Sequence, residues 1–530
     1  MFSTKNNVLQ LTSLMLKSGI TEVVVCPGSR NIPLVHTFVA SGMKCYEVTD
    51  ERSAAFFALG LIEANGGRPV AVCCTSGSAV LNLAPAVSEA YYRPLPLLVI
   101  TADRPQRWIG QMDGQTMRQP LAFSSCIRKV VTLPEVQTLD SEDSWYCNRL
   151  INEAFITLYK SAGPVHINVP ISEPMFDFSA PTLPDERLIQ YVPSNTAFSL
   201  TPDMKESWHN AATTMLIVGQ LSPEEAHTLA PSILSIAKSG CIIIAETLSN
   251  LHTIPELTPY LASNFEQVLA YEQPFPVPEL IITLGGHIVS KRLKQYLRLH
   301  KPSAHWHISP LGEVADLFMS STMLIHTTPT AFTEALAAEK KEGKHSHEPL
   351  YTNERDIKGD TEIHTILSAI GPEWSLQVAN STMIRTVNRL LHTPNPVFCN
   401  RGINGIEGSI STAVGYWAGS HRPTLILTGD LSFFYDQNAL WNTFVKHPEA
   451  PLRIVLLNNG CGDIFHHLPG LASPALDRYI SASHNTTAEG AALQCGAHYT
   501  HTTSPETLNT VLPSFLSMEN DVRILEIHSS

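Results

Sequence analysis

The sequence alternates short, largely apolar runs with segments long enough for a helix. The runs rich in β-branched residues are Val23–Cys26, Val70–Cys74, Leu97–Thr101, Leu216–Val218, Ile242–Ala245, Leu280–Leu284, Trp306–Ile308, Thr424–Thr428, Ile454–Leu457 and Arg523–Ile527. Strands that are apolar at nearly every position are buried on both faces, as in parallel sheets covered by helices on each side. The pattern therefore predicts an α/β chain built from doubly wound parallel-sheet domains.

Two stretches have the composition of linkers. One lies near Pro174–Pro202 and is rich in proline, and the other, Glu339–Thr361, is rich in Lys, Glu, His and Gly. A chain of 530 residues is long enough for three or four domains of about 150 residues each. We therefore expect three domains, at residues 1–180, 200–338 and 362–530.

The first and third of these pieces resemble each other weakly. In each, a glutamate (Glu51 or Glu407) precedes a small-residue segment, then an Arg-Pro pair and a strand that ends in a glycine-containing loop. This similarity indicates a duplicated α/β unit on either side of a different middle domain.

Composition limits the partners and the compartment. The net charge of −13 argues against nucleic acid or an anionic membrane surface as the main partner. No apolar run approaches the roughly 18 residues of a membrane span, and Met1–Lys17 has the spacing of an amphipathic helix rather than of a signal peptide. The ten cysteines form no Cys-x-x-Cys pair and lie in apolar settings, so we expect reduced thiols in a cytoplasmic protein.

Two strand-end loops carry oxygen ligands. Gly429-Asp430 and Asn458-Asn459 each follow an apolar run, and the carboxyl ends of parallel strands are where such sheets bind ligands. Taken singly, Asp430 suits a helix cap and the asparagines suit a turn. Together, a carboxylate and an amide oxygen suit Mg²⁺ or a similar hard cation bridging to a diphosphate.

This pair of motifs resembles the signature of thiamine-diphosphate enzymes, which consist of a pyrimidine-binding, a central and a diphosphate-binding domain. The resemblance implies thiamine diphosphate as cofactor, with Gly429 beside it and Mg²⁺ (or Mn²⁺) held by Asp430, Asn459 and the backbone carbonyl of Cys461. One departure is Leu431, where the family usually has glycine.

A glutamate heads a helix in the first domain. Alone, Asp50-Glu51 has an ordinary interpretation, with Asp50 as an N-cap and Glu51 favoured by the helix dipole. In the family, a glutamate at this place hydrogen-bonds the aminopyrimidine ring and activates the cofactor. The resemblance further implies that Ile406 supports the bent cofactor, and that Ile464, Phe465 and Leu468 form an apolar wall beside the thiazolium.

Further strings resemble the branch of this family that serves menaquinone biosynthesis. They are Cys26–Arg30, Thr101–Pro105, Gln115–Pro120, Gly285–Leu293, Asn380-Ser381 with Arg385, Asn400–Gly402, Gly405–Gly408 and Ile464–Pro469. The resemblance implies that 2-oxoglutarate is decarboxylated and that the resulting carbanion adds to isochorismate in a Stetter-type 1,4-addition. The enzyme is thus expected to be a transferase that forms a carbon–carbon bond.

Both implied substrates are dicarboxylates, which favours a site with several fixed cations, preferably arginines whose forks match carboxylates. The candidate cations are Arg30, Arg104, Lys291, Arg292, Arg385 and Arg401. By resemblance, Gln115 and Ser381 also contact substrate or cofactor-bound intermediate, Phe465 and Leu468 line the substrate site, and Glu51, Arg30, Gln115, Ser381, Arg385 and Arg401 carry the catalysis. Gly114 departs from the family, which often has asparagine there.

The resemblance also implies a homodimer or homotetramer, with Glu51 of one chain facing Asp430 of another. Two other functions stay open from the sequence. One is a thiamine-dependent 2-oxo acid decarboxylase or carboligase with a different acceptor, and the other is a non-catalytic protein that retained cofactor binding. The middle domain has no Gly-x-Gly-x-x-Gly after a strand, which argues against a flavin-bearing relative.

Overall fold

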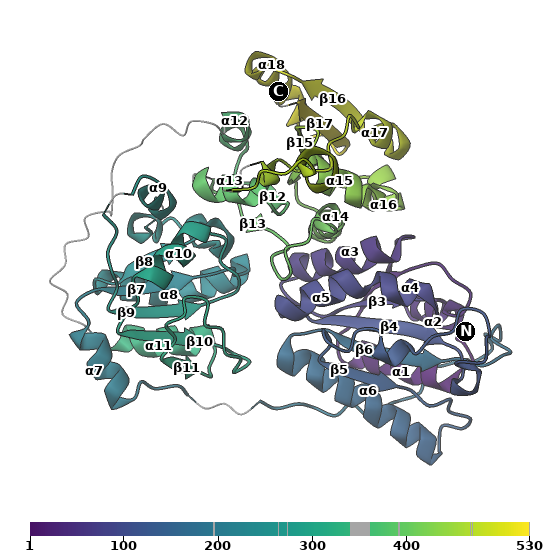
Figure 1. Ribbon diagram of the computed structural model, residues 1–530. Coiled ribbons are helices and arrows are strands. Elements are labelled where there is room, and N and C mark those ends of the chain that lie inside the picture. Colours follow the sequence, from purple (N-terminus) through teal and green to yellow (C-terminus); the bar gives the residue numbers. More distant parts are fainter. Residues whose placement is uncertain are drawn as a thin grey trace. The chain divides into compact units, whose positions relative to one another are not determined.

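The computed structural model describes residues 1–193, 197–262, 264–272, 274–339, 361–390, 393–466, 468 and 470–528. Its chain divides into two compact units. Unit 1 comprises residues 1–193, 400–501 and 517–530, and unit 2 comprises residues 194–399 and 502–516. The strands form three parallel sheets with helices between them, which confirms the predicted α/β fold class (Figure 1).

The N-terminal sheet of unit 1 has the strand order β2-β1-β3-β4-β6-β5. Its strands are β1 (Glu22–Val25), β2 (Lys44–Glu47), β3 (Val70–Cys74), β4 (Leu97–Asp103), β5 (Lys129–Thr132) and β6 (Val165–Pro170). The helices that connect them are α1 (Asn6–Lys17), α2 (Ile32–Ala40), α3 (Glu51–Ala64), α4 (Ser78–Asn82), α5 (Ala84–Tyr92) and α6 (Glu142–Ser161).

Alternate residues of these strands enter two separate cores. Val70, Val72 and Cys74 of β3 pack with residues of α3 and α5, whereas Ala71 and Cys73 pack with residues of α1 and α6. Figure 1 shows α3 and α5 on one face of this sheet and α1 and α6 on the other. The sheet is therefore covered on both faces, which is why its strands are apolar at every position.

Unit 2 contains a five-stranded sheet in the order β11-β10-β9-β7-β8. Its strands are β7 (Thr214–Val218), β8 (Ile242–Ala245), β9 (Leu280–Leu284), β10 (Ala304–Ile308) and β11 (Met323–Ile325), and a parallel pair, β12 (Ser375–Val378) and β13 (Val397–Phe398), lies in the same unit. Its helices are α7 (Pro202–Asn210), α8 (Pro223–Lys238), α9 (Phe265–Ala270), α10 (Lys291–Leu299), α11 (Pro329–Ala338), α12 (Thr361–Ala369), α13 (Thr382–Leu390) and α18 (Pro505–Phe515).

The C-terminal strands of unit 1 follow the order β14-β15-β17-β16, the same relative order as β3-β4-β6-β5 in the N-terminal sheet. This agreement supports the duplicated unit expected from the sequence. The strands are β14 (Thr424–Gly429), β15 (Leu452–Asn458), β16 (His498–Thr502) and β17 (Val522–His528), and the helices are α14 (Ser409–Ser420), α15 (Asp430–Asp436), α16 (Thr443–Lys446) and α17 (Glu489–Cys495).

Helices α3 and α14 pack against each other at two glycines. A Cβ at Gly60 would lie 2.0 Å from the carbonyl oxygen of Thr412, and one at Gly415 would lie 2.1 Å from that of Phe57. Only glycine permits such an approach of two backbones. This contact joins the N-terminal and C-terminal sheets into one apolar core within unit 1.

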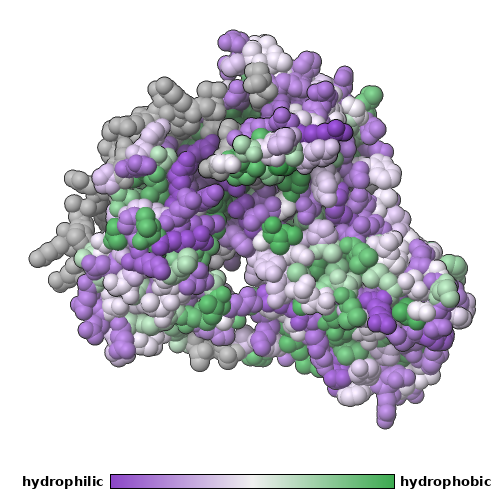
Figure 2. Space-filling view, viewed as in Figure 1, coloured by the Kyte–Doolittle hydropathy of each residue, from purple (hydrophilic) through white to green (hydrophobic). Residues whose placement is uncertain are grey.

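The sequence predicts a helix near the N-terminus and a linker at Glu339–Thr361. The helix expected within residues 1–17 is α1, which begins at Asn6. Among the described residues, no helix combines the length and apolar character needed to cross a membrane, and the face in Figure 2 mixes hydrophilic and hydrophobic residues. Most of the expected Glu339–Thr361 linker, from Lys340 to Asp360, lies outside the described residues.

Candidate active site

Strand register brings the two oxygen-bearing loops of the C-terminal sheet together. Gly429, the last residue of β14, pairs with Leu457 of β15, so Asp430 and Asn458-Asn459 emerge at the same carboxyl edge. The Asp430 and Asn459 side chains both accept the backbone N–H of Cys461, at 3.1 and 3.2 Å. Asp430 is buried at the start of α15 and Asn459 is exposed. Two hard oxygen groups thus converge on one turn.

Asp430 has several polar neighbours in addition to Cys461. Its other carboxylate oxygen accepts the N–H of Leu431 at 2.6 Å. Burial raises its pKa, and this effect outweighs the opposing influence of these N–H groups and of His484. The Nε2 atom of His484 lies 3.4 Å from the Asp430 carboxylate. No motif in the sequence marks His484, which lies in a stretch without helix or strand.

The two asparagines of Asn458-Asn459 face different ways. Asn458 is buried and donates to the Glu526 carboxylate at 2.6 Å and to the Thr486 carbonyl at 2.8 Å. Glu526 on β17 is fully buried and also accepts from Tyr499 and the Ala488 N–H. Asn458 therefore anchors the turn from behind, which leaves Asn459 at the surface. Glu526 is a second residue that the sequence analysis missed.

Glu51 is the first residue of α3. The helix is capped by Asp50, whose carboxylate accepts the Ser53 N–H at 3.1 Å. Glu51 is half-buried. Burial raises the pKa of the Cys26 thiol, and the charge of Glu51 raises it further. Glu51 therefore lies near Cys26, which directly follows β1. The predicted activator thus sits at the carboxyl edge of the N-terminal sheet.

Arg30 and Arg104 follow strands of the same sheet. Arg30 is 6% exposed, and its guanidinium lies 3.0 Å from the Ile171 carbonyl and 3.1 Å from Glu173. Arg104 donates from Nε to the Gly114 carbonyl at 2.9 Å and pairs with Asp113 at 3.0 Å. The backbone of Gly114 thus contacts a predicted substrate cation.

Gln115 is exposed and has a positive φ of 55°. Four residues later, Gln119 is fully buried and fixes this loop to the sheet. Its amide donates to Asn168 at 2.8 Å and accepts the Gly77 N–H at 3.0 Å. The buried hydrogen bonds of Gln119 therefore fix the loop that carries Gln115.

Of the apolar candidates, Ile406 contacts the helix that Asp430 begins, and the others follow Asn459 in the chain. Ile406 is 37% exposed, and its carbonyl accepts from Ser432 of α15 at 2.7 Å. Ile464 and Phe465 are half-buried within a short 3₁₀ helix, Asp463–Phe465. Leu468 is 41% exposed, and the neighbouring Pro469 lies outside the described residues.

Unit 2 carries Lys291, Arg292 and Arg385, whereas Arg401 is buried in unit 1. Lys291 and Arg292 begin α10, and Arg292 forms an ion pair with Glu266 at 3.4 Å. Ser381 is half-buried with a positive φ of 70°, and Arg385 is exposed on α13.

Buried polar contacts fix the loop before α10 and the helix α13. The Glu246 carboxylate accepts the N–H groups of Val289 and Ser290, just before α10, the second at 2.6 Å. The Thr247 N–H donates to Asn388 of α13 at 3.0 Å. One short segment after β8 therefore holds the elements that carry Arg292 and Arg385.

The fold and these loops define the class of protein. Residues 6–123 match the family described as thiamine pyrophosphate enzyme, N-terminal TPP binding domain, and residues 186–366 match the middle domain of thiamine pyrophosphate enzymes. The X-ray structure of an enzyme from Mycobacterium smegmatis described as thiamin diphosphate-dependent has the same fold, with a TM-score of 0.73, 18% identity and 99% of each chain covered.

Full-length relatives narrow this class. A protein of Bacteroides thetaiotaomicron is 46% identical over 100% of this chain and 97% of its own length. One of Bacteroides fragilis is 43% identical over 98% and 95%, and one of Flavobacterium johnsoniae is 34% identical over 96% and 93%. All three are named 2-succinyl-5-enolpyruvyl-6-hydroxy-3-cyclohexene-1-carboxylate synthase.

The chain belongs to this synthase family. The predictions of a thiamine-diphosphate-dependent enzyme and of the menaquinone branch are thereby confirmed. The roles of the individual site residues, the metal ion and the oligomeric state stay predictions.

Proposed function

We propose that this chain decarboxylates 2-oxoglutarate and adds the remaining four-carbon unit to isochorismate, giving 2-succinyl-5-enolpyruvyl-6-hydroxy-3-cyclohexene-1-carboxylate. The convergence of Asp430 and Asn459 on the Cys461 turn carries this proposal, in a chain whose full-length relatives bear the name of this synthase. The product is a precursor for menaquinone synthesis.

The residues of the turn fit a divalent cation and a diphosphate. A carboxylate, an amide oxygen and a backbone carbonyl make up the all-oxygen donor set that Mg²⁺ prefers and that Mn²⁺ also accepts. In this proposal Asp430, Asn459 and Cys461 hold the metal ion, and Gly429 lets the diphosphate approach the backbone. When bound, thiamine diphosphate supplies the electron sink for loss of CO₂.

The chain's own residues bind, orient and transfer protons. Glu51 hydrogen-bonds the aminopyrimidine ring through its carboxyl group and exchanges a proton with it. Ile406 supports the bent cofactor. Ile464, Phe465 and Leu468 form the apolar surface that keeps water from the reacting carbon, because protonation there would waste the four-carbon unit. Gln115 and Ser381 contact the substrates.

The cations bind the two dicarboxylates in this proposal. The set consists of Arg30, Arg104, Lys291, Arg292, Arg385 and Arg401. Arg104 and Arg292 already pair with Asp113 and Glu266, so substrate carboxylates compete with these partners.

The active site is proposed to form between two chains. Within unit 1, the residues beside Glu51 contact the end of α15 and the short 3₁₀ helix Gln437–Leu440 that follows it: Arg52 donates to the Tyr435 carbonyl at 2.7 Å and Asp50 accepts from Asn438 at 2.9 Å. Asp430 begins α15, about 7.5 Å from Tyr435 along the helix axis at 1.5 Å per residue. In this proposal Glu51 faces Asp430 of a partner chain, in a homodimer or homotetramer. All ten cysteines are free thiols, which is compatible with the proposed cytoplasmic location.

The test is consumption of isochorismate, followed by its ultraviolet absorbance, with 2-oxoglutarate, thiamine diphosphate and Mg²⁺ present. We expect loss of absorbance only when all components are included. Release of CO₂ while isochorismate persists would favour a decarboxylase or carboligase with another acceptor. Bound cofactor with neither change would favour a non-catalytic protein.

A further inference from the structure

The loop that carries Arg401 is fixed by a buried carboxylate from α5. The Glu89 side chain is 1% exposed and accepts the N–H groups of Gly402 and Ile403 at 2.8 and 2.9 Å. A Cβ at residue 402 would lie 2.9 Å from this carboxylate and 2.7 Å from the Glu89 carbonyl oxygen. Glycine therefore permits the close approach of this loop to α5.

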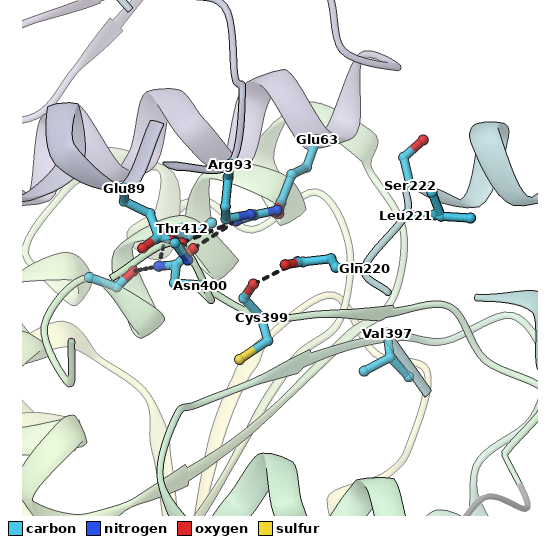
Figure 3. Close-up of polar contacts among 12 residues, drawn as sticks. Glu63, Glu89, Arg93, Gln220, Leu221, Ser222, Val397, Cys399, Asn400 and Thr412 are labelled. Carbon is cyan, nitrogen blue, oxygen red and sulfur yellow. Dashed lines mark hydrogen bonds and ion pairs between the residues drawn. The ribbon is translucent and has the colours of Figure 1, made fainter. Parts of the chain in front are cut away.

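The residue on the other side of Arg401 is fixed as well. The Asn400 side chain accepts from Arg93 at 3.1 Å and donates to Thr412 at 2.9 Å. Arg93 in turn pairs with Glu63 of α3 at 2.6 Å and lies 3.8 Å from Glu89. Figure 3 shows Arg93 between Glu63 and Asn400, with Glu89 beside them. Arg401 thus lies between two residues whose positions are set by buried hydrogen bonds.

Stability alone gives little reason for this arrangement. Burying ionised groups costs several kcal/mol each, and a buried ion pair is often no more stable than apolar side chains of the same volume. Burial raises the pKa of Glu89, although Arg93 and the two N–H groups oppose this effect. Two convergent acceptor oxygens do, however, fix two successive peptide groups in one orientation, which no apolar side chain can do.

We infer that Glu89, assisted by Arg93, is a positioning residue that orients Arg401 toward a substrate carboxylate. The inference rests on the proposed function, in which Arg401 binds one of the two dicarboxylates. Glu89 itself contacts Gly402 and Ile403, so it acts through the backbone of the loop.

The test compares Glu89→Gln with Arg401→Lys by steady-state kinetics. Glutamine keeps the size of the side chain but has only one acceptor oxygen, so one of the two N–H groups loses its partner. We expect Glu89→Gln to raise the KM of the same substrate as Arg401→Lys, by about tenfold, with kcat changed less than threefold. The double variant is expected to fall well short of the product of the two effects, because both act on one interaction.

A second readout is independent of activity. Hydrogen exchange at the Gly402 and Ile403 amides is expected to become at least about tenfold faster in Glu89→Gln, with the rest of unit 1 unchanged. Glu206→Gln, at an exposed position on α7, is the matched control and should change neither measurement. If Glu89→Gln does not fold, Arg93→Lys takes its place in the test. Lysine keeps the positive charge but lacks the planar guanidinium that donates to both Asn400 and Glu63, so a smaller rise in the same KM is expected.

The outcomes separate this inference from the proposed function. If Arg401→Lys leaves the KM of both substrates unchanged, the proposed role of Arg401 is wrong. If Arg401→Lys raises a KM while Glu89→Gln lowers only the fraction of folded protein, Glu89 is structural and the inference is overturned. Fully additive effects in the double variant would overturn it too.

Discussion

Glu51 is half-buried and begins α3 at the carboxyl edge of the N-terminal sheet. Glu51→Gln keeps the size of the side chain but cannot exchange a proton with the aminopyrimidine ring. Because a positioned acid or base contributes roughly 10²–10⁴-fold, we expect isochorismate consumption to slow by at least about 100-fold. Binding of thiamine diphosphate, measured by calorimetry, serves as the control and should change little. Full activity of the variant would rule out Glu51 as the activator.

The pair Asn458-Asn459 allows metal binding and stability to be separated. Asn459 is exposed and Asn458 is bonded to the buried Glu526. Asn459→Ala should raise the Mg²⁺ concentration for half-maximal activity by roughly 10–100-fold without lowering the unfolding temperature. Asn458→Ala leaves the Glu526 carboxylate without one of its donors and should cost about 3 kcal/mol of stability. Equal effects of both variants on Mg²⁺ dependence would contradict this division of roles.

The positions of site residues were predictable where they depend on a single loop. Asp430 and Asn459 each directly follow an apolar strand, so strand ends alone suggested that they meet. Glu526 supports Asn458 from 68 residues away, and nothing in the local pattern of a strand marks a buried glutamate as its partner. Glu89 was hidden for the same reason, because its partners Gly402 and Ile403 lie over 300 residues further along the chain.

At the scale of elements, the crossing of α3 and α14 depends on Gly60. A Cβ there would meet the Thr412 carbonyl oxygen at 2.0 Å, so the helices must separate. We expect Gly60→Ala to lower the free energy of unfolding by about 3 kcal/mol, as overpacking does, despite alanine's higher helix propensity. Urea unfolding measures this change.

The control for that substitution is another helical glycine. Gly490 on α17 is exposed, and a Cβ there would meet nothing within 4 Å. Gly490→Ala should therefore stabilise the protein by about 0.5–1 kcal/mol. If both alanine variants stabilise the protein, the close approach at Gly60 is not rigid.

Continuous apolar strands were the predictable elements. The run Leu280–Leu284 is β9 with the same bounds, and Ile242–Ala245 is β8. Shorter or more polar strands such as β2 (Lys44–Glu47) and β16 (His498–Thr502) were not predicted. They have partly exposed residues at several positions, so their sequences lack the uninterrupted apolar character that burial on both faces imposes. These segments form strands because each hydrogen-bonds to a neighbouring strand of its sheet, which its own sequence pattern does not indicate.

At the scale of the whole molecule, each unit buries groups that titrate abnormally. Burial raises the pKa of Glu246 in unit 2 to about 7 and that of Asp436 in unit 1 to about 6. Burial lowers the pKa of His252 in unit 2 to about 4 and that of His166 in unit 1 to about 3. Burial thus favours the neutral form of each group, and the carboxyls and the imidazoles affect the pH dependence of stability with opposite signs.

Glu246 provides the clearest case. A carboxyl whose pKa is raised on folding stabilises the fold fully below its ordinary pKa of 4.5, and this contribution is lost as the pH rises toward 7. At about 1.4 kcal/mol per pH unit, the protein should lose about 3 kcal/mol over this range relative to Glu246→Gln, which does not titrate. Urea unfolding of both proteins from pH 4.5 to pH 8 measures the difference.

His252→Gln tests the opposite sign in the same segment of unit 2. An imidazole whose pKa is lowered by burial stabilises the fold fully above its ordinary pKa of 6.5, and this contribution is lost as the pH falls toward 4. The parent protein should therefore lose about 3 kcal/mol relative to His252→Gln on acidification. The pH ranges of the two effects overlap between about pH 4.5 and pH 6.5. There, as the pH rises, the stability that the parent protein loses at Glu246 is offset by the stability it gains at His252. The Glu246→Gln variant lacks the first effect, so its free energy of unfolding shows the pH dependence of His252. If the difference in free energy of unfolding between the parent protein and a variant stays constant across pH, the buried group does not have the shifted pKa that its burial implies.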